Sequence, residues 1–360
     1  MSIKEIAQIV GASPATVSRV LNNPEYRCKT PELRERIWKT AIEKNYTPNE
    51  SARNLKMGKQ ADRQQTCYIS VLMTRMEEAH TDPFFSELLW VIESEIHNHM
   101  CILSNVWYKS LFSDNRECRR SDLNGIIREM YAEAEQNGRS DGLIVIGKCN
   151  REALKKLIQT FKNVVSVNRN STNYEVDEVL CDGNKIASVA VEHLISLGHR
   201  NIAYVGACHN ESRYSGYQET LGRHGIDLEP ENVIETKQTE AEGYKCMEKW
   251  LQSGSYPSAV YCANDITAIG MLKCLSRYKR LYYMPSIIAS DDIELAQDIR
   301  PMLTTVRLPK DEMGKFALYL LLDRIRGGHK GVVRMELEGK LVVRNSCVDA
   351  SQEVWSDYCI

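Results

Sequence analysis

The segment IKEIAQIVGASPATVSRVLN, residues 3–22, decides the fold of the N-terminal part of the chain. Apolar side chains recur on one helical face over residues 3–10, and a second helix with its own start signal, Ser13-Pro14, follows a glycine turn. Two helices that cross at a tight turn need a small residue at the crossing, a residue that tolerates positive φ in the turn, and aliphatic side chains between them. The residues at those positions are Ala7, Gly11, Val17 and Val20. The segment therefore predicts a helix-turn-helix, with a generic small helical bundle as the alternative.

Two more helices are expected before the pattern changes from helices alone to strands that alternate with helices. Thr30-Pro31 repeats the start signal for a third helix, and Asn49 can cap a short fourth helix over Glu50–Met57. Residues 58–65 are polar and form a linker. We therefore divide this part of the chain into a helix-turn-helix DNA-binding domain, residues 1–48, and a short helix with its linker, residues 49–65.

Beyond the linker, strand-like runs alternate with amphipathic helices, which predicts parallel sheets covered by helices on both faces. The expected strands are Cys67–Met73, Cys101–Val106, Gly142–Ile146, Val164–Val167, Ile202–Val205, Ala259–Cys262 and Ser286–Ala289. Near the end, the runs Val332–Leu337 and Lys340–Arg344 flank Glu338-Gly339 and predict a hairpin. The fold class is thus an all-α head followed by an α/β body.

Composition and charge narrow the class of protein. Hydrophobic residues make up 43% of the 360 residues and charged residues 26%, with no apolar run long enough for a membrane span. Twelve Cys without a Cys-x-x-Cys pair, and no export signal, predict reduced thiols and a cytoplasmic protein. Residues 1–60 hold eleven Lys and Arg against six Glu and no Asp, a balance of +5, which leaves −7 for the rest. This basic N-terminal segment on an acidic remainder of the chain suggests that the N-terminal segment binds a polyanion.

Enzyme motifs are missing from the sequence. It contains no Gly-x-Ser-x-Gly elbow, no P-loop and no His-Glu-x-x-His pair, and its eight His are scattered. Asp291-Asp292 are adjacent, so their side chains would diverge rather than share an acid–base task. We expect no catalytic site, no metal site and no cofactor.

Three motifs resemble the lactose-repressor/galactose-repressor (LacI/GalR) family of bacterial transcriptional regulators. They are IKEIA at residues 3–7, SPATVSRVLN at 13–22 and YTPNESARNL at 46–55. The resemblance implies a hinge helix within 49–65 and a two-lobed, periplasmic-binding-protein-like body with parallel sheets over residues 66–350. It implies an N-lobe of about 66–169 and 303–328, and a C-lobe of about 170–302 and 329–350. It also implies a homodimer that represses transcription from operator DNA and is switched by a small sugar bound between the lobes.

The predicted DNA-binding residues fall on two helices. If the second helix enters the major groove, Pro14, Ala15 and Arg19 reach base edges, and Thr16, Ser18 and Asn22 contact phosphates. The alternatives are that Thr16 and Ser18 face solvent and that Arg19 pairs with a nearby Glu. The resemblance places Leu55 between base pairs in the minor groove, although an exposed leucine there could simply be a packing residue. Tyr46, just before the hinge segment, and Asn49, Arg53 and Leu55 within it are also expected to contact DNA.

Candidate effector-binding residues follow the strands of the body, where open α/β sheets bind ligands. Arg213 stands in the family's Arg-x-x-Gly-aromatic motif, and the resemblance also places Asp291 in the pocket. Asp82 could equally cap a helix, and Asp265 is expected to cap the next helix and leave Asn264, or the pair Asn264-Asp265, to the cleft. Lys148 and Arg169 are weaker candidates, because either could be a solvated loop base. The expected effector site is Asp82, Phe84, Lys148, Arg213, Asn264 and Asp291.

The effector itself is less defined by the sequence. The motifs Asp82-Pro83-Phe84-Phe85, Ile146-Gly147-Lys148 and Leu303-Thr304-Thr305-Val306 resemble repressors of β-galactosidase operons most, so a galactoside is expected. Gln238 stands where several sugar-binding members have a tryptophan. Two other interpretations stay open: a global catabolite regulator that responds to a phosphorylated carrier protein, and a sugar-binding module without regulatory DNA binding. The polar segment 107–138 has no assigned role, and the tail lacks the leucine heptads of a coiled-coil tetramer.

Overall fold

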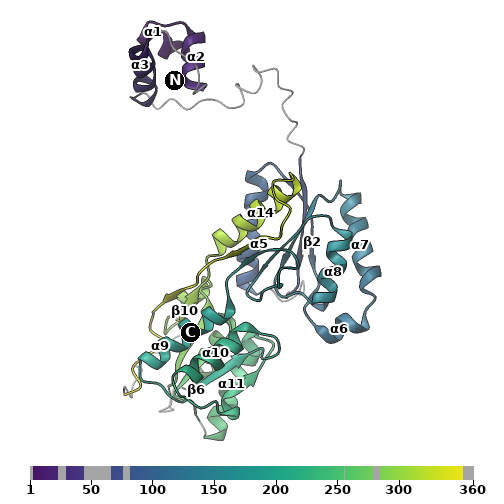
Figure 1. Cartoon of the computed structure of the whole chain (residues 1–360). Coiled ribbons are helices and arrows are strands. Elements are labelled where there is room, and N and C mark those ends of the chain that lie inside the picture. Colours follow the sequence, from purple (N-terminus) through teal and green to yellow (C-terminus); the bar gives the residue numbers. More distant parts are fainter. Residues whose placement is uncertain are drawn as a thin grey trace. The chain divides into compact units, whose positions relative to one another are not determined.

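The computed structural model describes residues 3–22, 30–43, 66–75, 82–254, 256–278 and 284–351. The chain divides after Thr66 into two compact units, a small helical head and a larger α/β body (Figure 1).

The head contains the predicted helix-turn-helix. Helices α1 (Ile3–Val10), α2 (Pro14–Asn22) and α3 (Pro31–Glu43) pack around a small apolar core. Gly11 makes the turn with φ +67, a conformation that L side chains rarely adopt. The Ser13 hydroxyl accepts a hydrogen bond from the backbone N–H of Thr16 at 3.1 Å and so caps α2. The buried side chains of this core include Ile6, Ala7, Val10, Val17, Val20 and Ile37.

The first lobe of the body is built on a parallel six-stranded sheet in the order β11-β5-β4-β3-β1-β2. Its strands are β1 (Tyr68–Met73), β2 (Ile102–Tyr108), β3 (Gly142–Ile146), β4 (Val164–Asn168), β5 (Asp177–Leu180) and β11 (Arg334–Glu336). Side chains alternate between the faces: Val71 packs toward α5 (Pro83–Asn98) and α14 (Lys310–Ile325), whereas Leu72 packs toward α7 (Leu123–Gln136) and α8 (Arg151–Thr160). Figure 1 shows the helices on the two sides of this sheet.

The segment 107–138, which had no role at the level of sequence, completes the second of these faces. After β2 it forms η1 (Ser110–Phe112), α6 (Asn115–Arg120) and then α7. Its apolar side chains join a separate core cluster under the sheet. The segment looks polar because only one stripe of its helices is buried; the buried residues include Phe112, Cys118, Leu123, Ile127 and Met130.

The second lobe repeats the arrangement with the order β12-β10-β9-β8-β6-β7, and only β12 is antiparallel to its neighbour. Its strands are β6 (Ile202–Gly206), β7 (Val233–Glu235), β8 (Ala259–Cys262), β9 (Ser286–Asp291), β10 (Thr304–Arg307) and β12 (Lys340–Val342). The main helices are α9 (Gly183–Ser196), α10 (Ser212–Arg223), α11 (Glu240–Ser253) and α12 (Asp265–Arg277), with the short η2 (Pro230–Asn232) and α13 (Leu295–Asp298). Helices α9 and α10 pack together, as do α11 and α12.

The predicted hairpin near the end of the body is wrong. Strand β11 pairs in parallel with β5 in the first sheet, whereas β12 pairs with β10 in the second. Glu338-Gly339 therefore lies in a crossover between lobes. A hairpin and two edge strands have the same local pattern, so only the pairing partners distinguish them.

The crossovers also lie later in the chain than expected. Strand β5 belongs to the first sheet and β10 to the second, so the chain changes lobe between β5 and α9, between β10 and α14, and between β11 and β12. The expected boundaries near residues 169, 302 and 328 missed these short strands, because runs of three or four residues carry little periodic signal. None of the helices in the described ranges is long and apolar enough to span a bilayer.

Candidate functional site

The exposed face of α2 is the candidate DNA-binding surface of the head. Pro14, Ala15 and Arg19 are exposed on it, while Thr16 and Ser18 are half-buried. The Thr16 hydroxyl lies 2.8 Å from that of Ser13, within the cap of the helix. Arg36 donates a hydrogen bond to the Val10 carbonyl, which ties α3 to the end of α1 behind this face. The N-terminal end of α2 is therefore held by a cap and a packed core, as an inserted recognition helix requires.

Several predicted DNA-binding positions fall outside this description. Asn22 is the last residue of α2, and its side chain is not among those described. The hinge positions Tyr46, Asn49, Arg53 and Leu55 lie outside the described residues. Their proposed contacts with DNA stay predictions.

In the body, the carboxyl ends of both sheets meet at a cleft, and a small cavity lies there. Three of the six predicted effector residues line it: Phe84, Lys148 and Arg213. The lining also includes residues that were not among the six expected effector-binding residues, one of them the weaker candidate Arg169. They are Arg75, Phe85, Leu88, Asn168, Arg169, Asn170, Glu211, Gln238 and Met313. Arg75, Lys148 and Arg169 each follow a strand of the first sheet, so position after a strand was the signal that could have found Arg75.

A buried ion pair forms one wall of the cavity. Arg213 Nε lies 2.7 Å from Glu211 Oε1, with side chains 2% and 0% exposed. A second guanidinium nitrogen of Arg213 donates to the Ala263 carbonyl at the end of β8. Burial would raise the pKa of Glu211, but the cations around it, Arg213 first and then Arg75 and Arg169, outweigh burial and lower that pKa to about 2. The other carboxylate oxygen of Glu211, Oε2, has no hydrogen-bond donor among the described residues, so it can accept one from a ligand.

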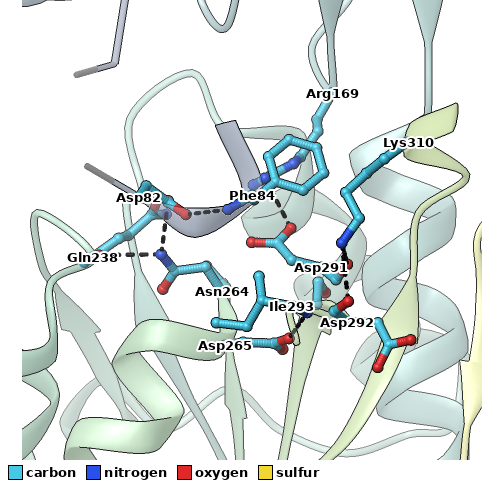
Figure 2. Close-up of polar contacts among 12 residues, drawn as sticks. Asp82, Phe84, Arg169, Gln238, Asn264, Asp265, Asp291, Asp292, Ile293 and Lys310 are labelled. Carbon is cyan, nitrogen blue, oxygen red and sulfur yellow. Dashed lines mark hydrogen bonds and ion pairs between the residues drawn. The ribbon is translucent and has the colours of Figure 1, made fainter. Parts of the chain in front are cut away.

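Arg169 and Asp291 make a second charged pair, beside Phe84 (Figure 2). The Arg169 guanidinium carbon lies 4.2 Å from the centre of the Phe84 ring, and its Nη2 lies 2.8 Å from Asp291 Oδ1. The angles of that contact are not those of a hydrogen bond, so within the described part of the chain both Asp291 oxygens and Arg169 Nε and Nη2 keep bonding capacity. Burial raises the pKa of Asp291 well above its ordinary value, and Arg169 opposes the shift. Such atoms can bond ligand hydroxyls.

Asp82, Asn264 and Gln238 connect the two lobes next to the cavity. Asp82 caps α5 by accepting from the Phe84 N–H at 3.0 Å. Asn264 Nδ2 donates to the Gln238 carbonyl at 3.1 Å and lies 3.4 Å from Asp82 Oδ2, as Figure 2 shows. Asp82 and Asn264, like Asp291 beside Arg169, thus lie next to the cavity rather than in its lining.

The helix cap expected at Asp265 is made by Asn264, which also lies at the cleft. Asn264 is the N-cap of α12, and its Oδ1 accepts from the Thr267 N–H. Asp265 is fully buried, where Oδ1 accepts from the Thr305 hydroxyl at 2.6 Å and Oδ2 from the Ile293 N–H at 3.0 Å (Figure 2). Burial raises the pKa of Asp265 to about 6, although both hydrogen bonds oppose it. The prediction that Asp265 caps the helix is wrong, because Asx capping by Asn264 uses the same helix start.

Across the described ranges, no cluster of His, Cys, Asp and Glu could hold a metal ion. The cleft can bond a small polar molecule through amide, carboxylate and guanidinium groups, and its apolar side is formed by Phe84, Phe85, Leu88 and Met313.

Comparisons with known proteins bear on the whole chain. Residues 2–49 match "Bacterial regulatory proteins, lacI family", and residues 191–347 match a "Periplasmic binding protein-like domain". The HTH-type transcriptional repressor CytR of Escherichia coli K12 is 30% identical, with 96% of each chain covered. The HTH-type transcriptional repressor MelR of Bacillus subtilis is 29% identical over 98% of this chain and 99% of MelR. The relatives are transcriptional repressors rather than enzymes, as the sequence predicted.

Solved structures agree on the fold. A structure of the Lac repressor dimer bound to operator and the anti-inducer ONPF superposes with a TM-score of 0.65 at 23% identity, covering 97% of this chain and 99% of that chain. The agreement supports a helix-turn-helix region followed by a two-lobed α/β body.

Proposed function

The chain belongs to the LacI family of bacterial regulatory proteins and is a transcriptional repressor with a ligand-binding body. From that premise we propose that it is a homodimer whose affinity for operator DNA is switched by a small sugar bound in the cleft. Arg19 would read a base edge from α2, and Pro14 and Ala15 would make apolar contacts beside it. Thr16, Ser18 and Asn22, with the hinge residues Tyr46, Asn49 and Arg53, would position the head on the duplex, and Leu55 would enter the minor groove.

The observation that carries the proposal is that both lobes supply polar groups to one cavity. Arg75 Nη2 donates to Gln238 Oε1 at 2.7 Å, and Lys148 Nζ donates to the His209 carbonyl at 2.9 Å. Each bond joins the first lobe to the second. A ligand that adds or replaces such bonds has different affinities for different lobe arrangements, which is what a conformational switch requires.

A galactoside is the proposed effector. Adjacent sugar hydroxyls need planar partners that both donate and accept, and the cleft offers them in Arg213, Asp291 and the amide of Gln238. Asp82, Asn264 and Lys148 complete the proposed set, and Phe84 provides an apolar ring next to Arg169.

The proposal of a homodimer is supported by exposed aromatic side chains on the first lobe. Trp90 is 68% exposed on α5, next to Asp311 and Lys315 of α14, and Tyr319 of α14 is 37% exposed. Exposed aromatic groups of this size are typical of protein interfaces. A pseudo-palindromic operator needs two heads, so self-association would provide the second.

The test is a gel-shift titration of the full-length protein with an operator obtained by in vitro selection. We expect a steep negative slope of log affinity against log salt, and about 10-fold to 100-fold weaker specific binding for Arg19→Ala. Lys39→Ala, an exposed base on α3, serves as the matched control and should weaken binding less. A protein that binds selected and random duplexes equally would contradict the proposal.

A further inference from the structure

We propose that the effector carries an anionic group, a phosphate or a carboxylate, which binds between Arg75 and Lys148. The inference rests on the proposed function, because it specifies the ligand of the same cleft. It goes beyond that function by giving the ligand a charge.

The charges around the cavity do not balance. Four cationic side chains line it, Arg75, Lys148, Arg169 and Arg213, together with one acidic side chain, Glu211. Arg213 is matched by Glu211 at 2.7 Å, and Arg169 is matched by Asp291 at 2.8 Å, just outside the lining. Arg75 and Lys148 are then left as the two charges to be explained.

Both of these cations bond to neutral acceptors. Arg75 donates to the amide oxygen of Gln238, and Lys148 donates to the backbone carbonyl of His209. Within the described ranges, neither makes an ion pair with a carboxylate. Glu77 and Glu78 follow Arg75 in the sequence but lie outside the described residues, so the experiment below includes them.

Burial disfavours the charge of both cations, and the charged neighbours act in both directions. Burial lowers the pKa of Arg75, and the nearby Arg213 and Arg169 lower it further, while Glu211 opposes them. Burial also lowers the pKa of Lys148, and Arg75 and Arg213 add to that effect, while Glu211 and Glu235 oppose it. A bound anion would reverse both contributions, because it would face several cations in a partly desolvated site.

The remaining unpaired atoms fit the hydroxyls of the same ligand. Gln238 Nε2 and Arg169 Nε are buried donors, and Glu211 Oε2 is a buried acceptor, each without a partner among the described residues. A phosphorylated sugar or a sugar acid would use both sets of groups, whereas a neutral galactoside would leave Arg75 and Lys148 without an anion.

The test begins with inorganic phosphate as the probe. We expect phosphate to raise the Tm of the full-length protein by about 2–4 °C over chloride at equal ionic strength. Arg75→Gln and Lys148→Gln should each remove most of this increase. Lys155→Gln, an exposed base on α8 outside the cavity, should keep it. The proposal would be overturned if phosphate raised the Tm of Arg75→Gln and Lys148→Gln as much as that of the parent protein, or if it did not raise the Tm of the parent protein. It would also be overturned if phosphate raised the Tm only when Glu77 and Glu78 were both changed to Gln.

Calorimetry with galactose, galactose 6-phosphate and galactonate then identifies the source of the anion. The phosphate or the carboxylate compound should bind at least about tenfold tighter than galactose, and Arg75→Gln should remove that preference. Tightest binding of neutral galactose would refute the anionic effector. If galactose also released operator DNA, the proposed function would stand without this inference; if the protein failed to prefer any duplex, the proposed function itself would fail.

Discussion

Changing Glu211 to Gln tests the buried ion pair at the wall of the effector cavity. The substitution keeps the size of the side chain and an acceptor for Arg213 Nε, but it leaves the guanidinium of Arg213 buried without its charged partner. A carboxyl group whose pKa falls from 4.5 to about 2 on folding contributes about 3 kcal/mol at neutral pH. Breaking a buried pair by removing one partner costs about 3–5 kcal/mol, which agrees. We therefore expect Glu211→Gln to lower the free energy of unfolding of the body by about 3 kcal/mol.

The sign of the pH dependence follows from the lowered pKa of Glu211. The stabilisation is present above the unfolded value of 4.5 and is lost as the pH falls toward 2. The Glu211→Gln protein should therefore lose less stability between pH 5 and pH 3 than the parent protein does.

Urea unfolding of the body, followed by circular dichroism at pH 7, measures this effect. Glu192→Gln is the matched control, because its pair with Arg223 at 3.3 Å has side chains 42% and 58% exposed. Exposed pairs contribute about 0–1 kcal/mol, so this variant should be nearly neutral. If Glu211→Gln were as mild as Glu192→Gln, the reasoning about the buried pair would be refuted.

Three further predictions concern other parts of the molecule. Gly11→Val should destabilise the head by more than about 1 kcal/mol, because Gly11 has φ +67; faster hydrogen exchange of the α1 and α2 amides would report it, and unchanged exchange would contradict it. Hydrogen bonds to Asp323 and Asp177 raise the pKa of His329, so its contribution to stability is full below pH 6.5 and lost as the pH rises through the raised value. Thermal unfolding of His329→Gln against pH should lack this step, and an unchanged profile would contradict it. Trp90→Asp should shift the protein toward monomer in sedimentation velocity, because Trp90 is 68% exposed on α5; an unchanged sedimentation coefficient would argue against that surface.

The sequence predicted the regular parts of the fold. The bounds predicted for β3 and β8 match the observed strands at both ends, because buried parallel strands are nearly continuous apolar segments. The pattern failed at β5, β10 and β11, which are three or four residues long and were assigned to no strand, to the wrong lobe or to a hairpin. The pairing of such short strands depends on distant partners that local periodicity does not contain.

The candidate site was predicted in part for a similar reason. Residues after strands were the correct place to look, and Phe84, Lys148 and Arg213 do line the cavity. Arg75 was missed, and the burial of Asp265 was not predicted, because both depend on contacts between segments far apart in the chain. The charge imbalance of the cavity is likewise a property of the assembled lobes.

The most direct test of the account is the affinity of one ligand with and without DNA. Galactose 6-phosphate, and galactose as its neutral counterpart, would be titrated into the free protein and into the complex with selected operator. Reciprocity requires operator to change ligand affinity by the same factor by which ligand changes operator affinity, typically about 5-fold to 150-fold. The account predicts weaker ligand binding in the operator complex; equal affinities in the two titrations would contradict a ligand-switched repressor.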